Sequence, residues 1–200
     1  MRDITLDYYN SHAREFADST IQADMHDAAD RFLKEIVPGG HILDLGCGSG
    51  RDSKYFLEKG YHVTAVDGSP ELCRIASEYI SQDVICRDFF EINEEETYDG
   101  IWACASLLHV EKERLPELLQ NLHRALKEQG ILYVSFKEGA SSGMRNGRYF
   151  TDMTEDTIKE LFADSDWREV QVWQSLDVRD NHPGESWVNG VFRKSLAGDM

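Results

Sequence analysis

The chain is short of basic residues. Of its 200 residues, 21 are lysine or arginine and 37 are aspartate or glutamate, so the formal net charge is −16. A protein with this charge repels the phosphates of nucleic acids and the surfaces of anionic membranes at long range. The composition therefore argues against extended nucleic-acid binding and against docking on a membrane surface.

Long apolar runs and paired cysteines are also missing. No apolar stretch approaches the roughly 20 residues that a membrane-spanning helix requires, and residues 1–10 lack the apolar segment of a signal peptide. The four cysteines form no C-x-x-C pair, and together with the seven histidines they show no zinc-binding spacing. We expect a cytoplasmic protein with free thiols, no membrane segment and no metal site.

The remaining composition suits one compact α/β domain over residues 1–200, because 41% of the residues are hydrophobic and no repeat or flexible linker interrupts them. Residues 3–37 show helical spacing of apolar side chains and end at Pro38-Gly39-Gly40. After this point strands and helices alternate. The predicted strands are residues 41–45, 62–67, 84–86, 100–104, 130–137, 169–175 and 187–194, the last two antiparallel at the sheet edge. The predicted helices are residues 52–59, 70–80, 115–128 and 154–163.

Local signals refine these boundaries. Ser69 followed by Pro70, and Thr154 before the last helix, are expected N-caps. The acidic residues 94–96 and 164–166 are interpreted as solvated loops, and residues 139–147 as a Gly/Ser-rich loop. The strands lack strict polar alternation, which is typical of a parallel sheet covered on both faces. Ligands of such sheets bind at the carboxyl ends of the strands, so the residues after each strand are the candidates for a site.

A glycine loop follows the first strand, with Gly46, Gly48 and Gly50. Glycines allow positive φ and close approach of a ligand to the backbone. A dinucleotide fingerprint would require a glycine at position 51, which is Arg51. Asp44, inside the strand, is unfavourable beside a pyrophosphate and suits a cationic ligand such as an ammonium or sulfonium group. An ordinary strand-to-helix turn is the alternative interpretation of this loop.

Residues 42–50, Ile-Leu-Asp-Leu-Gly-Cys-Gly-Ser-Gly, resemble the first motif of class I S-adenosylmethionine-dependent methyltransferases, and the resemblance covers roughly residues 8–137. It implies an α/β fold, a Rossmann-like three-layer α/β/α sandwich with N-terminal helices. The implied sheet is seven-stranded and mostly parallel, with strand order 3-2-1-4-5-7-6 and strand seven antiparallel. The implied cofactor is S-adenosylmethionine, with S-adenosylhomocysteine as product.

The resemblance also implies a role for the residues after each strand. The glycine loop would pass the amino-acid part of the cofactor, and Asp67 would hold the ribose, although Asp67 also suits a surface turn. Asp88 would contact the adenine amino group, and Phe89 would stack on adenine or belong to the core. The cofactor-binding residues expected on these grounds are Tyr9, Asp44, Gly46, Cys47, Gly48, Gly50, Asp67, Gly68, Ser69, Asp88, Phe89 and Ala105.

The acceptor side is less well defined. His109, after the fourth strand, is the candidate general base, and the alternative is a histidine that only packs and bonds to backbone. The N-terminal helical segment, residues 1–37, is interpreted as a lid carrying Tyr9, or as an ordinary apolar helix face. Four residues are candidates for binding an anionic group of the acceptor, namely Lys137, Arg148, Arg179 and Trp187. Alternatively, Lys137 and Arg148 pair with acids such as Glu138, Asp152 and Glu155.

These observations favour a methyltransferase for a small-molecule acceptor, acting as a monomer or homodimer. In this interpretation residues 38–137 bind the cofactor and residues 138–200 supply acceptor-side loops and the last strands. An RNA-modifying methyltransferase is the first alternative, which the net charge disfavours. A non-catalytic cofactor-binding protein and a nicotinamide-dependent dehydrogenase are the others. The sequence does not identify the acceptor.

Overall fold

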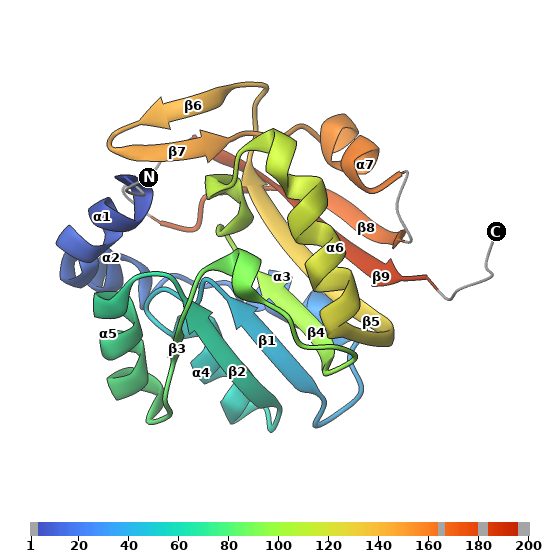
Figure 1. Ribbon diagram of the computed structural model, residues 1–200, viewed down its shortest axis with the longest axis horizontal. Helices are drawn as coiled ribbons and strands as arrows, with labels where there is room; N and C mark the ends of the chain where they lie inside the picture. The colour runs from blue at the N-terminus through green and yellow to red at the C-terminus, as the bar shows by residue number, and fades with distance from the viewer. Residues whose placement is uncertain (1–3, 164–166, 180–183, 196–200) are drawn as a thin grey trace.

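A seven-stranded mixed sheet forms the centre of the computed structural model, which describes residues 4–163, 167–179 and 184–195 (Figure 1). The order of the strands across the sheet is β3-β2-β1-β4-β5-β9-β8. Their bounds are β1 (His41–Leu45), β2 (His62–Asp67), β3 (Ile85–Cys86), β4 (Tyr98–Ala103), β5 (Leu126–Lys137), β8 (Trp167–Leu176) and β9 (Ser186–Lys194). β9 runs antiparallel to both of its neighbours, whereas β1 to β5 pair in parallel. The predicted strand order, including the antiparallel last strand, is confirmed.

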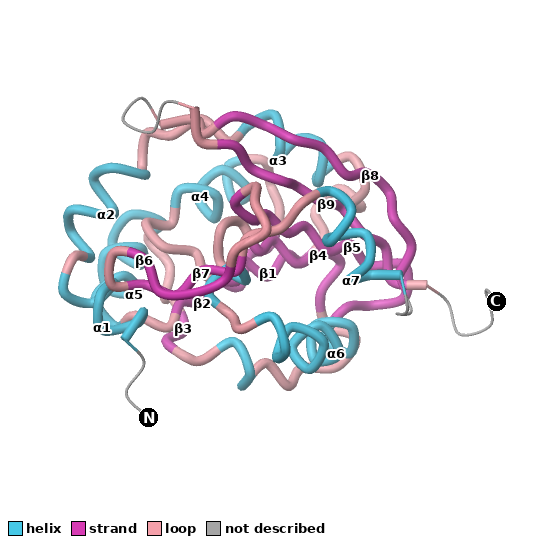
Figure 2. The backbone as a smooth tube through the Cα atoms, turned by 90° about the horizontal axis from the view of Figure 1, so that it is seen from above, coloured by secondary structure: helices cyan, strands magenta, loops and turns pink. Residues whose placement is uncertain are grey.

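Helices cover both faces of this sheet, as Figures 1 and 2 show. α3 (His26–Leu33), α4 (Arg51–Glu58) and α5 (Pro70–Ile80) pack on one face, and α6 (Leu115–Ala125) and α7 (Glu155–Ala163) on the other. Neighbouring strand residues point to opposite faces, so Ile42 and Trp102 join one apolar cluster while Leu43 and Ala103 join the other. Burial on both faces explains why the strands are apolar without alternation.

The N-terminal segment is helical but broken. α1 (Ile4–Ser11) and α2 (Ala13–Thr20) are separated at His12, and residues 21–25 separate α2 from α3. α1 and α2 pack on α5, where Ala13 and Ala17 contact a small cluster with Leu72 and Ile75. α1 and α2 therefore lie beside the loops that follow β1 and β2.

One expectation for the region after β5 was wrong. Residues 139–147, interpreted as a loop, contain the first strand and the turn of a β-hairpin built from β6 (Ser142–Arg145) and β7 (Arg148–Thr151). The turn is Asn146-Gly147, whose φ angles of 49° and 77° are those that a two-residue hairpin turn requires. Figure 1 places this hairpin above α1.

Two boundaries also differ from the predictions. The helix expected to reach residue 128 ends at Ala125, and β5 begins at Leu126. The helix stops because its last carbonyls, those of Arg124 and Ala125, accept hydrogen bonds from the backbone N–H groups of Glu96 and Thr97 at 2.9 and 2.8 Å. These bonds turn the chain into the sheet beside the start of β4.

The predicted N-caps are confirmed, since Ser69 Oγ accepts from Leu72 N at 3.2 Å and Thr154 Oγ1 accepts from Thr157 N at 3.2 Å. Three short 3₁₀ turns complete the described elements, namely η1 (Phe89–Glu91), η2 (Leu107–His109) and η3 (Lys112–Arg114). The loop expected at residues 164–166 and the ends of the proposed domain lie outside the described residues. Among the helices of the described ranges, none has the length and apolarity needed to cross a membrane.

Candidate active site

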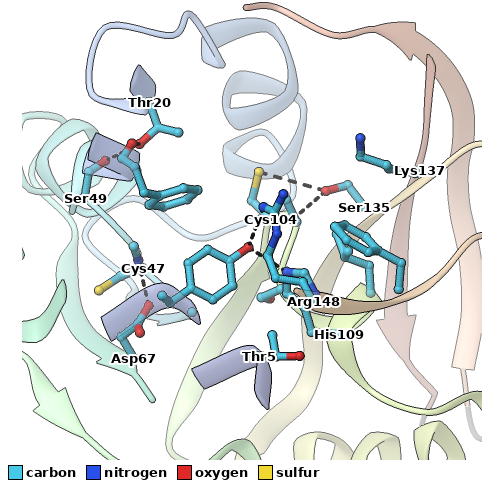
Figure 3. A pocket seen from close by; sticks show the side chains of 18 of the residues that line it. Thr5, Thr20, Cys47, Ser49, Asp67, Cys104, His109, Ser135, Lys137 and Arg148 are labelled. Atoms are coloured by element: carbon cyan, nitrogen blue, oxygen red, sulfur yellow. Dashed lines mark hydrogen bonds between the residues drawn. The ribbon is translucent and has the colours of Figure 1, made fainter. Parts of the chain in front are cut away.

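A cleft of about 810 Å³ opens at the carboxyl ends of the central strands. Figure 3 shows Cys47 and Asp67 at one end, Lys137 at the other, and His109 with Arg148 between them. Most of the residues expected to form the site line this cleft, and three of them, Asp44, Gly50 and Ser69, do not. The tertiary structure therefore joins the candidate cofactor and acceptor residues into one site.

The glycine loop serves two different purposes. Gly46 and Gly48 face the cleft with φ of 80° and 55°, and a Cβ on Gly46 would lie 2.5 Å from Ser106 Cβ. Gly50, with φ of 81°, instead faces α5, where its Cβ would lie 3.0 Å from Ile80 Cγ2. Gly46 and Gly48 thus let Ser106 and Phe16 pack against the loop at the wall of the cleft, whereas Gly50 allows α4 to pack closely on α5.

Asp67 joins the loops after β1 and β2. Its buried carboxylate accepts hydrogen bonds from Gly48 N and Ser69 N, both at 2.9 Å. Burial raises the pKa of Asp67, and these N–H donors oppose the rise. Each oxygen keeps acceptor capacity toward the cleft, so the carboxylate can still receive the hydroxyls of a ribose. Ser69 acts behind it, as the cap of α5 and as a donor to Asn10 Oδ1 at 2.7 Å.

Asp44 lies behind the glycine loop rather than in the cleft. Ser53 Oγ donates to its carboxylate at 2.6 Å, and burial raises the pKa of Asp44 to about 8, with the nearby charge of Asp52 adding to the rise. Asp52 in turn is paired with Arg51 at 2.6 Å and accepts from Trp102 Nε1 at 2.9 Å. Asp44 thus belongs to a buried polar network under the loop. The expected direct contact of Asp44 with a ligand has no support in this geometry.

The loop after β3 brings Asp88 and Phe89 to the cleft. Asp88 is exposed and caps η1, accepting from Phe90 N at 2.8 Å. Phe89 packs against the core, and its ring also lies 3.2 Å from the position of a Cβ on Gly46. Phe89 is therefore a core aromatic that also lines the cleft, and its stacking on adenine stays a prediction.

His109 has the orienting partners that sequence reasoning did not find. Its Nδ1 lies 2.6 Å from the backbone oxygen of Tyr149, which can only accept, so Nδ1 carries the proton. Nε2 then accepts from the Tyr9 hydroxyl at 2.8 Å. Burial raises the pKa of Tyr9, and the charge of Arg148 opposes the rise. Tyr9 and Tyr149 are far from His109 in sequence, which is why no local signal indicated them.

The candidate acceptor cations are not equivalent. Lys137 pairs with Glu185 rather than with a nearby acid, and Arg179 pairs with Asp177 at 2.6 Å. Asp177 also accepts from Trp187 Nε1 at 2.9 Å, and the hydrogen bonds from Arg179 and Trp187, working against burial, lower the pKa of Asp177 to about 2. Lys137 and Arg179 are thus already neutralised by carboxylates.

Further cleft residues were not predicted. Ser135, on β5, accepts from Ala105 N at 2.8 Å and holds Ala105 at a positive φ of 51°. Thr20, at the end of α2, donates to Ser49 in the glycine loop at 3.2 Å. Ser135 lies two residues before Lys137, so strand alternation was an available signal for it; nothing local indicated Thr20.

Within the described residues, no three His, Cys, Asp or Glu side chains are grouped to hold a metal ion.

Several relatives with similar sequences are methyltransferases by name. Residues 42–130 match the family model described as a methyltransferase domain. The chain is 31% identical over 163 residues to the putative methyltransferase YqeM of Bacillus subtilis, which covers 78% of this chain and 62% of that protein. It is 29% identical over 188 residues to the probable S-adenosyl-L-methionine-dependent methyltransferase TehB of Haemophilus influenzae, covering 90% and 61%. The chain thus spans about three fifths of the length of these two relatives.

Solved structures share the fold. A 1,6-didemethyltoxoflavin-N1-methyltransferase of Burkholderia thailandensis, crystallised with 1,6-didemethyltoxoflavin and S-adenosylhomocysteine, matches 96% of this chain and 88% of its own, with a TM-score of 0.80 at 22% identity. TehB of Haemophilus influenzae matches 90% and 66%, with a TM-score of 0.70 at 21% identity. The family match over residues 42–130, the relatives and the shared fold support the resemblance of the chain to class I S-adenosylmethionine-dependent methyltransferases.

The buried Asp44 predicts a pH effect on stability. Its pKa is about 8 in the folded protein against an ordinary 3.8. Between these values the folded protein keeps a proton that the unfolded chain has lost, so the free energy of unfolding falls as the pH rises. Asparagine at position 44 cannot ionise. We therefore expect the melting temperature of Asp44→Asn to rise relative to that of the wild type as the pH increases from about 5 to about 9. Exposed Asp83→Asn is the control, and an equal trend in both variants would contradict the assignment.

Proposed function

We propose that the protein transfers the methyl group of S-adenosylmethionine to a small-molecule acceptor. One observation carries this proposal: a single cleft joins the glycine loop and Asp67 to His109 and Arg148. When bound, the cofactor supplies an activated methyl group on a sulfonium. The protein then has to align the acceptor and, for some acceptors, remove a proton.

The cofactor end of the cleft fits this molecule. Gly46, Cys47 and Gly48 line this end of the cleft, and the glycines expose backbone that a ligand can approach closely. The Asp67 carboxylate suits the ribose hydroxyls, and Asp88 with Phe89 lies where the adenine would bind. We assign Cys47 and Gly68 to this end through their backbone, and Ser69 as the residue that positions Asp67 by donating its N–H.

Calorimetric titration tests the cofactor assignment. S-adenosylmethionine and S-adenosylhomocysteine are expected to bind, and NAD is not. Asp67→Asn should weaken both affinities about tenfold to hundredfold, because a charged hydrogen-bond acceptor for the ribose is lost. Asp83→Asn should bind as the wild type does, and circular dichroism checks that each variant folds. Binding of NAD alone would rule out the proposal.

The N-terminal helices α1 and α2 are proposed to close over the bound cofactor. Leu6 lies 2.7 Å from the position of a Cβ on Gly68, and Phe16 lies 3.1 Å from that on Gly48. The hydrogen bond from Tyr9 to His109 joins the same helices to the far side of the cleft. A ligand reaching Asp67 therefore lies beneath them, and its entry requires them to move.

Hydrogen exchange tests this lid. Adding S-adenosylhomocysteine should slow exchange of the backbone amides in residues 4–20, because the ligand adds contacts under α1 and α2. Exchange in α7, on the opposite face of the sheet, should not change. Equal exchange in residues 4–20 with and without the ligand would show that they are a static part of the fold.

His109 is proposed as the general base, through Nε2. Its Nδ1–H is held by the Tyr149 carbonyl, so Nε2 is the nitrogen that can take a proton from the acceptor once the Tyr9 hydroxyl moves away. The competing interpretation is that His109 only anchors α1 to the hairpin. The two interpretations predict different effects of a substitution at His109. Loss of a base lowers kcat, whereas loss of an anchor alters the affinity for the cofactor.

Methyl transfer from labelled cofactor to a panel of small acids, amines and thiols, with bulk tRNA as a separate arm, measures both the acceptor class and the role of His109. We expect label in small molecules and none in tRNA. His109→Ala should lower kcat about 10²- to 10⁴-fold while cofactor affinity stays within a few fold. Tyr9→Phe, which keeps the ring and removes the hydroxyl, is the matched variant for the anchor. Full turnover by His109→Ala would exclude His109 as the general base. If the cofactor binds but no acceptor receives the labelled methyl group, the non-catalytic alternative is favoured.

A further inference from the structure

Arg148 differs from Lys137, Arg145 and Arg179 because it lacks an acidic partner within the described residues. Arg114, which also lines the cleft without an ion pair, is exposed and lies 3.8 Å from the ring centre of Phe90. Lys137 is paired with Glu185, Arg179 with Asp177, and Arg145, opposite Arg148 in the hairpin, with Asp152. Within the described residues, no carboxylate lies within ion-pair distance of the Arg148 guanidinium. In a chain with 37 acidic residues and a net charge of −16, such an unpaired guanidinium requires an explanation.

The surroundings of Arg148 stabilise its charge but do not use its donors. The guanidinium lies 4.5 Å from the ring centre of Tyr8, 5.2 Å from that of Phe150 and 5.7 Å from that of Tyr9. Its Nε is buried without a hydrogen-bond partner, and Nη1 reaches the Tyr9 hydroxyl only at 3.5 Å. Aromatic faces attract a cation, but a guanidinium has five N–H donors, and a buried donor left unpaired is costly.

We propose that Arg148 binds the anionic group of the methyl acceptor, so that the acceptor is a small organic anion carrying a carboxylate or a similar oxyanion. The planar guanidinium matches an oxyanion with two parallel hydrogen bonds. This inference rests on the proposed function, and it narrows the four candidate acceptor residues to one that is available for an anion. Lys137 and Arg179 remain part of the wall of the cleft.

The same cleft provides an apolar surface for the rest of such a molecule. Met144, Leu176 and Val178 line it while 52%, 71% and 47% exposed. Exposed apolar side chains that line a cleft are typical of a binding surface. The acceptor therefore combines an oxyanion with an apolar or aromatic body, which excludes purely inorganic oxyanions and cationic amines.

Arg148 also lies next to the proposed base. The Tyr9 hydroxyl stands between them, 3.5 Å from Arg148 Nη1 and 2.8 Å from His109 Nε2. An oxyanion on Arg148 would therefore hold the acceptor beside His109 and would compete with the tyrosine for the guanidinium. Arg148 is thus an acceptor-binding residue on the lid side of the cleft.

Three probes test the proposal by calorimetry, each with the protein alone and saturated with S-adenosylhomocysteine. Benzoate has both the carboxylate and the apolar body, benzamide has the same shape without charge, and acetate has the charge without the ring. We expect benzoate to bind about tenfold or more tightly than either of the others. In nitrogen-detected spectra, the Arg148 Nε resonance should move with benzoate and not with benzamide.

Substitutions assign the effect to Arg148. Arg148→Gln should abolish the preference for benzoate over benzamide, and Arg148→Lys should keep a weakened preference, since it retains charge but not the planar fork. Arg145→Gln removes one charge from the same hairpin and should bind benzoate as the wild type does. Unchanged melting temperature and affinity for S-adenosylhomocysteine show that a variant is folded.

Several results would overturn the inference: equal binding of benzoate and benzamide, no binding of benzoate at all, or unchanged benzoate affinity in Arg148→Gln. If acetate binds as tightly as benzoate, the inference that the acceptor has an apolar body is wrong. If S-adenosylhomocysteine fails to bind while benzoate still binds through Arg148, the proposed function fails and the anion site stands. If only benzoate fails, the proposed function is untouched and the inference is wrong.

Discussion

The buried carboxylate of Asp67 is the interaction on which the cofactor end of the cleft depends. It accepts one backbone N–H from the loop after β1 and one from the loop after β2, and so holds two strand ends in a single arrangement. Ser69 then caps α5, and α5 supports the N-terminal helices. Because burial disfavours its charge, the N–H donors that stabilise the charge also order the loops around it.

The acceptor end depends on contacts between segments far apart in the chain. His109 is oriented by the carbonyl of Tyr149 in the hairpin and by the hydroxyl of Tyr9 in α1. These three residues come from a 3₁₀ turn, a strand and a helix that share no local sequence pattern. A movement of α1 would therefore change the hydrogen bonding of His109 and the surroundings of Arg148 together, which links opening of the cleft to the state of its reactive groups.

In this acidic chain, carboxylates pair with some of the cations around the cleft and leave others without an acidic partner. Glu185 and Asp177 neutralise two of the three cations expected to bind an anion, and Asp152 neutralises Arg145. Aromatic rings surround Arg148 instead, where they hold the charge and leave its donors unused. The distribution of partners, rather than the number of cations, therefore marks where an anion fits.

The sequence by itself determined the strand and helix pattern, the order of the sheet through its family resemblance, and the strand-end residues Gly46, Asp67 and Asp88, because periodicity and turn chemistry are local. The hairpin at Asn146-Gly147 was also available from that local signal and was missed. Only the tertiary structure decided that Asp44 and Gly50 lie behind the cleft, that Lys137 is neutralised, and that His109 has partners. The outcomes for Lys137 and His109 depend on contacts between residues 40 to 100 positions apart, which are set by packing of the whole sheet and not by any short stretch of sequence.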